Sequence, residues 1–294
     1  MGRTGLLTNR LLGSAQDASP DETGIRDKLI VALDFPSQND ALDLVHNLGD
    51  TVSIYKVGME LAYNPEAGFT FIRELINEHN KDVFLDLKIL DIPTTVSRAV
   101  KQLCNLGVRF LTIHSDRPAV KAAVEARNDA DEQRPTKIFC VTVLTSIDEL
   151  EWRELGWNKS IEETVGIRTR HAIENGADGV ICSGHEIEAA RSAANLISQN
   201  RNGILIATPG IRLEDDDNYD QKRVMLPEDA IRKGADHIIV GRPITQDRDP
   251  RMKAKAILDR IASALPAREA GLAIKSLDKR AEPQPRGAGL RLSV

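Results

Sequence analysis

Short runs of β-branched and other apolar residues alternate with amphipathic stretches from residue 28 to about residue 266. Eight of these runs have the length and composition of buried strands. They comprise residues 29–33, 53–57, 83–87, 109–113, 137–144, 179–182, 203–207 and 237–240. Apolar positions at helical spacing fill the intervals, as at residues 38–48, 96–106, 120–126, 186–196 and 252–264. This alternation predicts a single (β/α)8 TIM barrel of the α/β class, with a doubly wound sheet as the alternative.

Two short segments repeat one pattern before a predicted strand. NGADG stands at residues 175–179 and KGADH at residues 233–237. A glycine directly after a helix allows the left-handed backbone that ends many helices. We therefore expect one helix to end near Gly176 and another near Gly234.

The two ends of the chain depart from the alternation. The first sixteen residues carry two arginines and no acid, but too few leucines for a secretory signal. Prolines, glycines and scattered charges fill the last part of the chain. We therefore expect a flexible N-terminal extension over residues 1–24, a barrel domain over residues 25–266 and a flexible C-terminal tail over residues 267–294.

Composition narrows the class of protein. Among the 294 residues, 4% are aromatic and the formal net charge is −5. These values argue against a protein that binds nucleic acid, and no apolar run approaches the roughly 18 residues of a membrane helix. The three cysteines lie in apolar segments without a CxxC pair, which is typical of reduced core thiols. We expect a cytoplasmic protein with no nucleic-acid or membrane partner.

Polar residues gather where the predicted strands end. In a barrel, the side chains at the carboxyl ends of the strands build the active site. The residues at these positions are Asp34, Lys56, Asp86, Lys88, His114, Thr145, Ser146, Ser183, Thr208, Pro209, Gly241 and Arg242. Asp91 lies just beyond the end of the third strand.

The third strand carries the strongest signal. Side chains alternate between the two faces of a strand, so Asp86 and Lys88 share one face and the neighbouring leucines share the other. With the leucines toward the helices, both charges face the barrel axis, where an unpaired charge is costly. Asp34 and Lys56 converge on the same rim. Four charges of alternating sign predict a catalytic site, and an ion pair with a structural role is the alternative.

The last two strands predict an anion-binding site. Loops after the seventh and eighth strands of such barrels often bind phosphate. Gly241 lets backbone N–H groups approach an anion, and the guanidinium of Arg242 offers a fork of donors. Arg212 follows the seventh strand, and Gln221 lies in the same long polar loop (residues 213–225), which we interpret as a lid. Any one of these arginines alone would be read as a surface residue, but together they predict phosphate binding.

Seven segments form a characteristic series along the chain: VALDFPS (31–37), YKVGMEL (55–61), FLDLKILDIPTTV (84–96), VTVLTS (141–146), GVICSGHEI (179–187), TPGIR (208–212) and GADHIIVGRPIT (234–245). With these segments, the sequence resembles the orotidine 5′-phosphate decarboxylases over nearly all of residues 28–265. The D-x-K-x-x-D element, followed by I-P-x-T-V, is the most specific part of the resemblance. Leu90 stands where a histidine is frequent in this family and Thr94 where an asparagine is frequent.

The resemblance implies a role for each residue of the predicted site. Asp34 and Lys56 would bind the ribose hydroxyls, Asp86 would lie against the substrate carboxylate, and Lys88 would donate a proton to C6. The chain would form a homodimer with shared active sites, because three residues would reach into the neighbouring subunit's site: Asp91, Ile92 and Thr95. The residues that would hold the rest of the nucleotide are Thr145, Ser146, Pro209, Arg212, Gln221, Gly241 and Arg242, the last four at its 5′-phosphate.

The implied reaction is decarboxylation of orotidine 5′-monophosphate to uridine 5′-monophosphate, the last step of UMP biosynthesis. Loss of CO₂ leaves a carbanion in the plane of the ring, with no π-system to absorb it. The chain has no HxH, HExxH, GxGxxG, P-loop or Cys/His cluster, so we expect no metal and no cofactor. The remaining way to stabilise the carbanion is an ammonium group held in a fixed position beside it. Lys88 would supply it, kept charged by Asp86 and Asp91.

Two other functions stay open at this stage. The related 3-keto-L-gulonate 6-phosphate decarboxylases share the D-x-K-x-x-D element but rely on Mg²⁺ and typically carry a glutamate at the position of Lys56. A lysine at this position removes a candidate metal ligand. A phosphate-binding barrel without catalytic activity is the other alternative, and the complete set of four charges argues against it.

Overall fold

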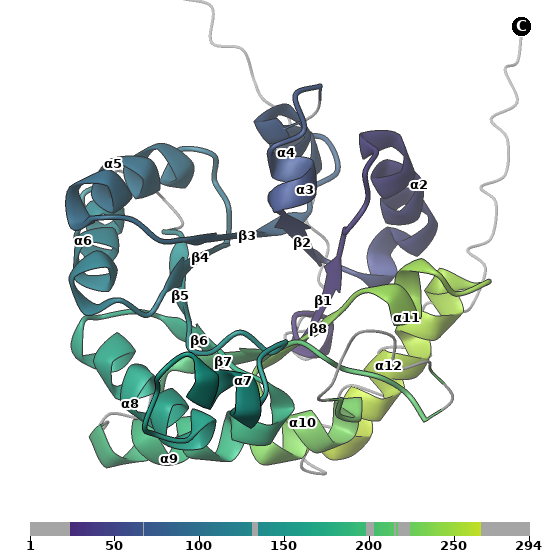
Figure 1. Cartoon of the computed structure of the whole chain (residues 1–294). Coiled ribbons are helices and arrows are strands. Elements are labelled where there is room, and N and C mark those ends of the chain that lie inside the picture. Colours follow the sequence, from purple (N-terminus) through teal and green to yellow (C-terminus); the bar gives the residue numbers. More distant parts are fainter. Residues whose placement is uncertain are drawn as a thin grey trace, which may run out of the picture.

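Eight parallel strands close into a barrel in chain order (Figure 1). The computed structural model describes residues 24–66, 68–130, 135–197, 203–214, 216 and 224–265. The strands are β1 (Leu29–Ala32), β2 (Ile54–Gly58), β3 (Asp82–Ile89), β4 (Phe110–His114), β5 (Lys137–Val141), β6 (Gly179–Ile181), β7 (Leu205–Thr208) and β8 (His237–Val240). The last strand pairs with the first, so the predicted (β/α)8 barrel is confirmed and the doubly wound sheet is excluded.

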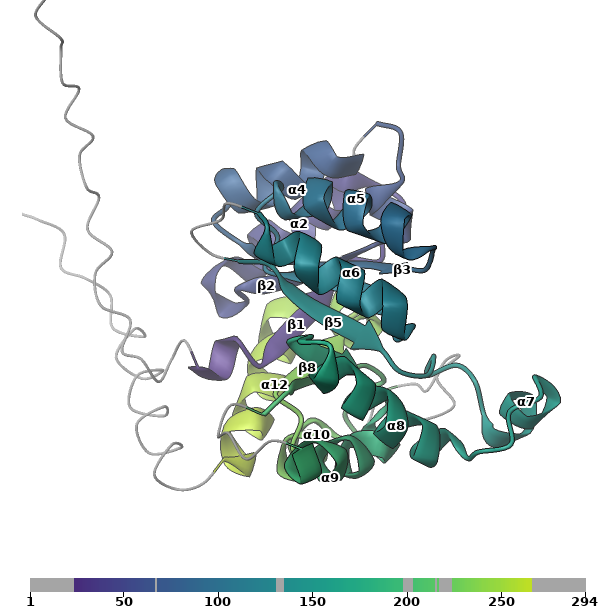
Figure 2. The same ribbon diagram turned by 90° about the vertical axis from the view of Figure 1, so that its left-hand side faces the viewer.

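Helices surround the barrel and connect successive strands (Figures 1 and 2). The α-helices are α2 (Gln38–Leu48), α3 (Met59–Ala62), α4 (Gly68–Asn77), α5 (Pro93–Cys104), α6 (Arg117–Asn128), α7 (Glu149–Glu154), α8 (Ile161–Glu174), α9 (Ile187–Ile197), α10 (Pro227–Lys233), α11 (Arg242–Thr245) and α12 (Pro250–Ala264). There are also two 3₁₀ turns in the described residues, η1 (Gly49–Thr51) after α2 and η2 (Gly184–Glu186) before α9. Figure 2 shows α7 standing apart from the other helices.

The two GAD segments form the same corner between a helix and a strand. Their glycines have φ angles of 78° and 108°, as expected for the left-handed backbone that follows a helix. The aspartate of each segment pairs with an arginine from an earlier helix: Asp178 with Arg127, and Asp236 with Arg191. Each aspartate also accepts a backbone N–H from the neighbouring strand. The repeated sequence therefore builds a repeated polar joint.

Three aromatic side chains pack among aliphatic ones in the interior of the barrel. The rings of Phe84, Phe110 and Phe139 lie with their centroids 5.1, 5.5 and 5.7 Å apart in tilted and edge-to-face pairs, which are favourable arrangements of aromatic rings. The ring of His237 lies 5.2 Å from that of Phe110. A second apolar layer joins the outer face of the strands to the helices. The interior layer closes the barrel below the carboxyl ends of its strands.

A polar network covers the amino end of the barrel. Arg109 donates hydrogen bonds to Asp27 at 2.7 Å and to Asp82 at 2.8 Å. Its guanidinium carbon lies 5.1 Å from the ring centroid of Phe110. The Nδ1 atom of His237 lies 2.7 Å from the carbonyl oxygen of Asp27. We call these four polar residues the amino-end network. It ties the chain before β1 to the starts of β3, β4 and β8.

At the carboxyl ends of the strands, two predicted boundaries differ from the structure by more than one residue. The predicted strand 137–144 ends at Val141, because a turn in which the N–H of Ile147 donates to the carbonyl of Leu144 follows. The predicted strand 83–87 continues to Ile89 through a shift of register against β4. The predicted C-terminal tail lies outside the described residues, and so does the predicted N-terminal extension except for Gly24.

Candidate functional site

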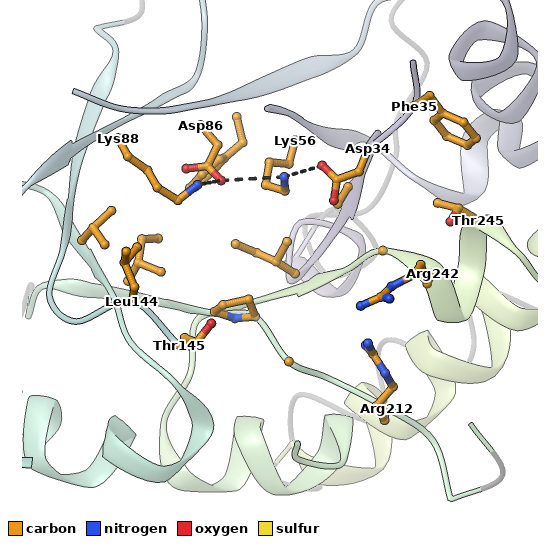
Figure 3. Close-up of a pocket in the computed structure, with 18 of the residues that line it drawn as sticks. Asp34, Phe35, Lys56, Asp86, Lys88, Leu144, Thr145, Arg212, Arg242 and Thr245 are labelled. Carbon is orange, nitrogen blue, oxygen red and sulfur yellow. Dashed lines mark hydrogen bonds and ion pairs between the residues drawn. The ribbon is translucent and has the colours of Figure 1, made fainter. Parts of the chain in front are cut away.

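A cavity of about 600 Å³ opens at the carboxyl ends of the strands (Figure 3). Its volume is within the range of pockets that bind small molecules. Nine of the residues predicted for the site line this cavity: Asp34, Lys56, Asp86, Lys88, Thr145, Pro209, Arg212, Gly241 and Arg242. They come from the ends of β1, β2, β3, β7 and β8 and from the segment after β5. Barrel closure therefore gathers residues that are far apart in sequence.

Four charged side chains form a continuous row along one wall of the cavity (Figure 3). Lys56 Nζ lies 2.8 Å from Asp34 Oδ1 and 3.7 Å from Asp86 Oδ2. Lys88 Nζ lies 2.7 Å from the same Asp86 oxygen. The predicted convergence of these charges is confirmed. The row alternates in sign, so each charge has a neighbour that compensates it. We call these residues the charged row.

Gly58, the last residue of β2, leaves room for the charged row. A Cβ atom on Gly58 would lie 3.4 Å from both Asp34 Oδ1 and Lys56 Nζ. This is the closest that a carbon atom ordinarily approaches such groups, so a larger side chain would press on the ion pair. A glycine at the end of β2 thus keeps the contact between Asp34 and Lys56 open.

Asp86 is the centre of the charged row. Its side chain is buried, and burial alone would raise the pKa of the carboxyl group. The positive charges of Lys56 and Lys88, with hydrogen bonds from Lys88 and Thr112, outweigh burial and hold the pKa of Asp86 below its ordinary value. Asp86 is therefore an anion at neutral pH. A buried carboxylate between two ammonium groups gives the cavity a strong local field.

Lys88 interrupts the regular strand. Its φ angle is 48°, in the left-handed region that residues other than glycine rarely adopt. The register between β3 and β4 shifts between Leu85 and Ile89, so the residue lies in a bulge. Lys88 and Asp86 do meet in the cavity, as predicted. Strict alternation along a regular strand is not the whole reason, because the bulge also sets the direction of Lys88.

Thr112 of β4 was not among the predicted site residues. Its hydroxyl accepts a hydrogen bond from the backbone N–H of Lys88 and donates one to Asp86 Oδ1, each at 2.9 Å. The side chain is fully buried. Its only signal in the sequence is a polar residue in the apolar segment FLTIH, and threonine is a common residue in strands.

Two arginines lie at the other end of the cavity. Arg212 and Arg242 point toward one another at the end of the cavity opposite Lys88 (Figure 3). The backbone of Arg212 is held by hydrogen bonds from its N–H to the carbonyl of Met225 and from the N–H of Met225 to the carbonyl of Gly210, at 3.0 and 3.1 Å. Two guanidinium groups facing one space can bind a dianion such as a phosphate monoester.

Several predicted residues lie outside the cavity lining. Asp91, Ile92 and Thr95 are exposed beyond the end of β3, and Ile92 retains 67% of its accessible surface. Asp91 accepts a hydrogen bond from the backbone N–H of Ile92 at 2.7 Å. Ser146 follows the cavity residue Thr145 but does not line the cavity itself. Gln221 and most of the predicted lid lie outside the described residues.

Other cavity residues carried no clear signal in the sequence. Phe35 and Pro36 directly follow Asp34, while Leu144, Gly210, Thr245 and Gln246 extend the walls. Their proximity to predicted strand ends could have marked them, but apolar residues and glycines at such positions are common in any barrel. His114 ends β4 without lining the cavity. Burial, with the nearby charges of Arg168 and Lys88, lowers the pKa of its imidazole.

The described residues offer neither a candidate metal cluster nor a candidate membrane span. They contain no group of three or more His, Cys, Asp or Glu side chains placed to hold a metal ion. Within the same part of the chain, no helix is both long and apolar enough to cross a membrane.

Comparison with known proteins gives consistent matches across the barrel. Residues 27–257 match the model of the orotidine 5′-phosphate decarboxylase / HUMPS family. A protein of Nitrobacter winogradskyi named orotidine 5′-phosphate decarboxylase is 45% identical over 247 residues, covering 84% of this chain and 98% of that protein. One of Rhodopseudomonas palustris with the same name is 42% identical over 244 residues, covering 83% and 98%.

A solved structure extends the match to three dimensions. The crystal structure of orotidine 5′-phosphate decarboxylase from Lactobacillus acidophilus aligns with a TM-score of 0.68 and 33% identity, covering 80% of this chain and 99% of that chain. That of the enzyme from Pyrococcus horikoshii aligns with a TM-score of 0.60 and 26% identity, covering 79% and 98%. Sequence and fold therefore point to the same group of proteins.

Proposed function

The chain belongs to the orotidine 5′-phosphate decarboxylase / HUMPS family, and from this premise we propose that it converts orotidine 5′-monophosphate to uridine 5′-monophosphate, the last step of UMP biosynthesis. The observation that carries the proposal is the charged row of Asp34, Lys56, Asp86 and Lys88, facing a cavity whose far end holds two arginines. One end suits a nucleotide phosphate, and the other suits chemistry on the base.

The arginine end binds the 5′-phosphate in this proposal. Arg212 and Arg242 donate to the phosphate oxygens, with the backbone of Gly241 beside them and Gln221 from the loop. Asp34 and Lys56 lie between the arginines and Lys88 along the wall, where they bind the ribose hydroxyls (Figure 3). Pro209 also lines this cavity. Binding energy gathered at the phosphate, far from C6, favours closure of the site over the substrate.

Lys88 carries out the chemistry at C6. The bond between C6 and the carboxylate carbon breaks, CO₂ leaves, and the electron pair of that bond stays on C6. The ammonium of Lys88 stabilises the developing negative charge and then transfers a proton to C6. The resulting amine regains its proton from solvent after the product leaves. The reaction in this form needs no metal and no organic cofactor.

Asp86 faces the substrate carboxylate in this arrangement. Both groups are negatively charged, so their proximity raises the free energy of the bound substrate until CO₂ departs. Lys56 and Lys88 keep Asp86 ionised and limit the cost of bringing a second anion close. Thr145 and Ser146 follow β5 and contact the nucleotide near its base.

The complete site is shared between two subunits in this proposal. Asp91, Ile92 and Thr95 are exposed and do not line the cavity of their own chain. A second copy of the chain, placed with its barrel mouth against the first, would receive these residues. Exposed Leu90, at 65% of its accessible surface, lies in the same segment and suits a covered interface. A homodimer in the cytoplasm is the form that we expect to be active.

The decisive experiment follows the loss of ultraviolet absorbance of orotidine 5′-monophosphate with purified protein in the presence of EDTA. Rapid conversion to uridine 5′-monophosphate is expected and would establish both the reaction and its independence of divalent metal. A folded, dimeric protein that gives no conversion would refute the proposal. The assay would then be repeated with Mg²⁺ and a keto-sugar phosphate, the substrate class of the alternative function.

A further inference from the structure

We propose that Thr112 is a positioning residue for the decarboxylation, holding the backbone of Lys88 and the carboxylate of Asp86 in one arrangement. This inference rests on the proposed function of the site. Thr112 is fully buried on β4, beside the bulge of β3. It acts through Lys88 and Asp86, the two residues assigned to the chemistry at C6.

One hydroxyl makes both contacts. A threonine Oγ can donate one hydrogen bond while it accepts another. Here Oγ1 accepts from the N–H of Lys88 and donates to Asp86 Oδ1, both at 2.9 Å. Asp86 Oδ2 is left for the ammonium of Lys88 at 2.7 Å and that of Lys56 at 3.7 Å. Groups from three strands therefore fix the plane of this carboxylate.

The contact with Lys88 lies where the register between β3 and β4 shifts. On either side of the bulge, Leu85 is paired with Leu111 and Ile89 with Ile113. Between these pairs, where the register shifts, the N–H of Lys88 donates to the side chain of Thr112. The left-handed region is strained for a residue other than glycine, so such a residue persists there only where its surroundings hold it. Thr112 supplies such a hold.

The test compares three variants by kcat, KM and thermal stability. Thr112→Val keeps the shape of the side chain but removes both hydrogen bonds. We expect its kcat to fall about 10- to 100-fold, because small displacements of a reacting group have effects of this size. Its KM should stay close to the wild-type value, since the phosphate and ribose contacts remain. Thr112→Ser retains the hydroxyl and should restore most of the kcat.

Thr136→Val is the matched control. Thr136 is also fully buried, and its hydroxyl donates to the carbonyl of Val108 at 2.8 Å, before β5 at the amino end of the barrel. Its loss should lower stability without changing the kcat of the folded enzyme. A folded Thr112→Val enzyme with wild-type kcat would overturn the inference, as would a Thr112→Ser enzyme as slow as Thr112→Val. Should the valine variant fail to fold, Thr112→Ala serves in its place.

Crystal structures separate this inference from the proposed function. They are compared without substrate, so they do not depend on which reaction the wild type catalyses. In Thr112→Val we expect Lys88 to leave its φ angle of 48°, or the contact of 2.7 Å between Lys88 and Asp86 to lengthen. In Thr112→Ser both should be retained. Unchanged geometry in Thr112→Val would refute the positioning role even if the wild type fails to convert orotidine 5′-monophosphate.

Discussion

Both ends of the barrel hold a cation between two carboxylates. At the amino end, Arg109 lies 2.7 Å from Asp27 and 2.8 Å from Asp82. At the carboxyl end, Lys56 lies 2.8 Å from Asp34 and 3.7 Å from Asp86. The first group packs on an aromatic ring, while the second faces a cavity of about 600 Å³.

The two ends differ in the chemistry of their cations. A guanidinium keeps its proton under all ordinary conditions and binds two carboxylates at once through its fixed fork, which suits a structural joint. An ammonium is a compact charge on a flexible stem and can give up a proton. The carboxyl end uses two lysines, and one of them, Lys88, lies in a bulge. Buried charge alone therefore does not mark an active site in this molecule. What distinguishes the carboxyl end is that its cations are lysines, which can transfer a proton, and that they face an open cavity.

The largest expected effect comes from Lys88→Ala. We expect kcat to fall by at least about 10⁴-fold, because the substitution removes both the proton donor and the charge that stabilises the carbanion. Ultraviolet assays measure the rate, and calorimetric titration with uridine 5′-monophosphate should show that binding survives. Lys255→Ala, at an exposed position of α12, is the control. Normal turnover by Lys88→Ala would show that the two ends do not differ as proposed.

At the amino end, Arg109→Met should act on stability alone. Removing the guanidinium leaves two carboxylates without their shared partner, and we expect the free energy of unfolding to fall by about 3 kcal/mol. The kcat of the folded enzyme should remain unchanged. Urea unfolding and activity measured on the same sample test both parts. A loss of kcat without a loss of stability would contradict the assignment of this network as structural.

Arg242→Ala tests the arginine end of the cavity independently of the end that holds Lys88. We expect kcat/KM for the nucleotide to fall about 10- to 100-fold, the range for a lost hydrogen bond to a charged group. The nucleoside orotidine, which lacks the phosphate, should be converted equally slowly by the variant and the wild type. Arg248→Ala, at an exposed position nearby, is the control. An equal loss with both substrates would place Arg242 outside the phosphate site.

Mixing two inactive proteins tests whether the carboxyl end is shared. Asp91→Ala and Lys88→Ala subunits, allowed to exchange, should recover about a quarter of the wild-type activity, because half of the dimers are mixed and each of these holds one intact site. Subunit exchange is confirmed by mass spectrometry. No recovery after confirmed exchange would argue that Asp91 acts within its own chain, and the contrast between a shared and an unshared end would fail.

The smallest effect concerns pH and His237. Burial lowers the pKa of this imidazole from 6.5 to about 4 in the folded protein. As pH falls through this interval, the unfolded chain takes up a proton that the folded protein does not, so stability decreases by about 1 kcal/mol per pH unit. Urea unfolding at pH 7, 6 and 5 measures the slope. His237→Asn should flatten it. Equal slopes for the two proteins would show that His237 does not contribute.

The barrel and the charged residues at its carboxyl end can be predicted from the sequence. The eight apolar runs predict the eight strands, because a parallel barrel buries both faces of each strand and leaves a continuous apolar signal. Asp34, Lys56, Asp86 and Lys88 follow from their places at strand ends. The motifs that resemble the family contain these four residues in the same order along the chain.

Other features depend on contacts that a sequence pattern does not contain. The bulge at Lys88 breaks the alternation from which its direction was inferred. Thr112 looks like any threonine in a strand until the bulge brings an N–H toward it. The predicted action of Asp91 depends on a second chain, so the pattern of one chain carries no geometry for it. What a sequence pattern does not contain, in each case, is a contact between residues that are distant along the chain or belong to different chains.

The backbone of Lys88 also has a consequence for protein design. Two residues other than glycine have positive φ angles in the described part of the chain, Asn80 and Lys88. Asparagine adopts this conformation more readily than lysine does. A redesign that optimised stability alone would choose glycine at position 88 and would discard the ammonium. Positions where such a redesign disagrees with the natural residue are therefore a way to search barrels of unknown chemistry for their reactive groups.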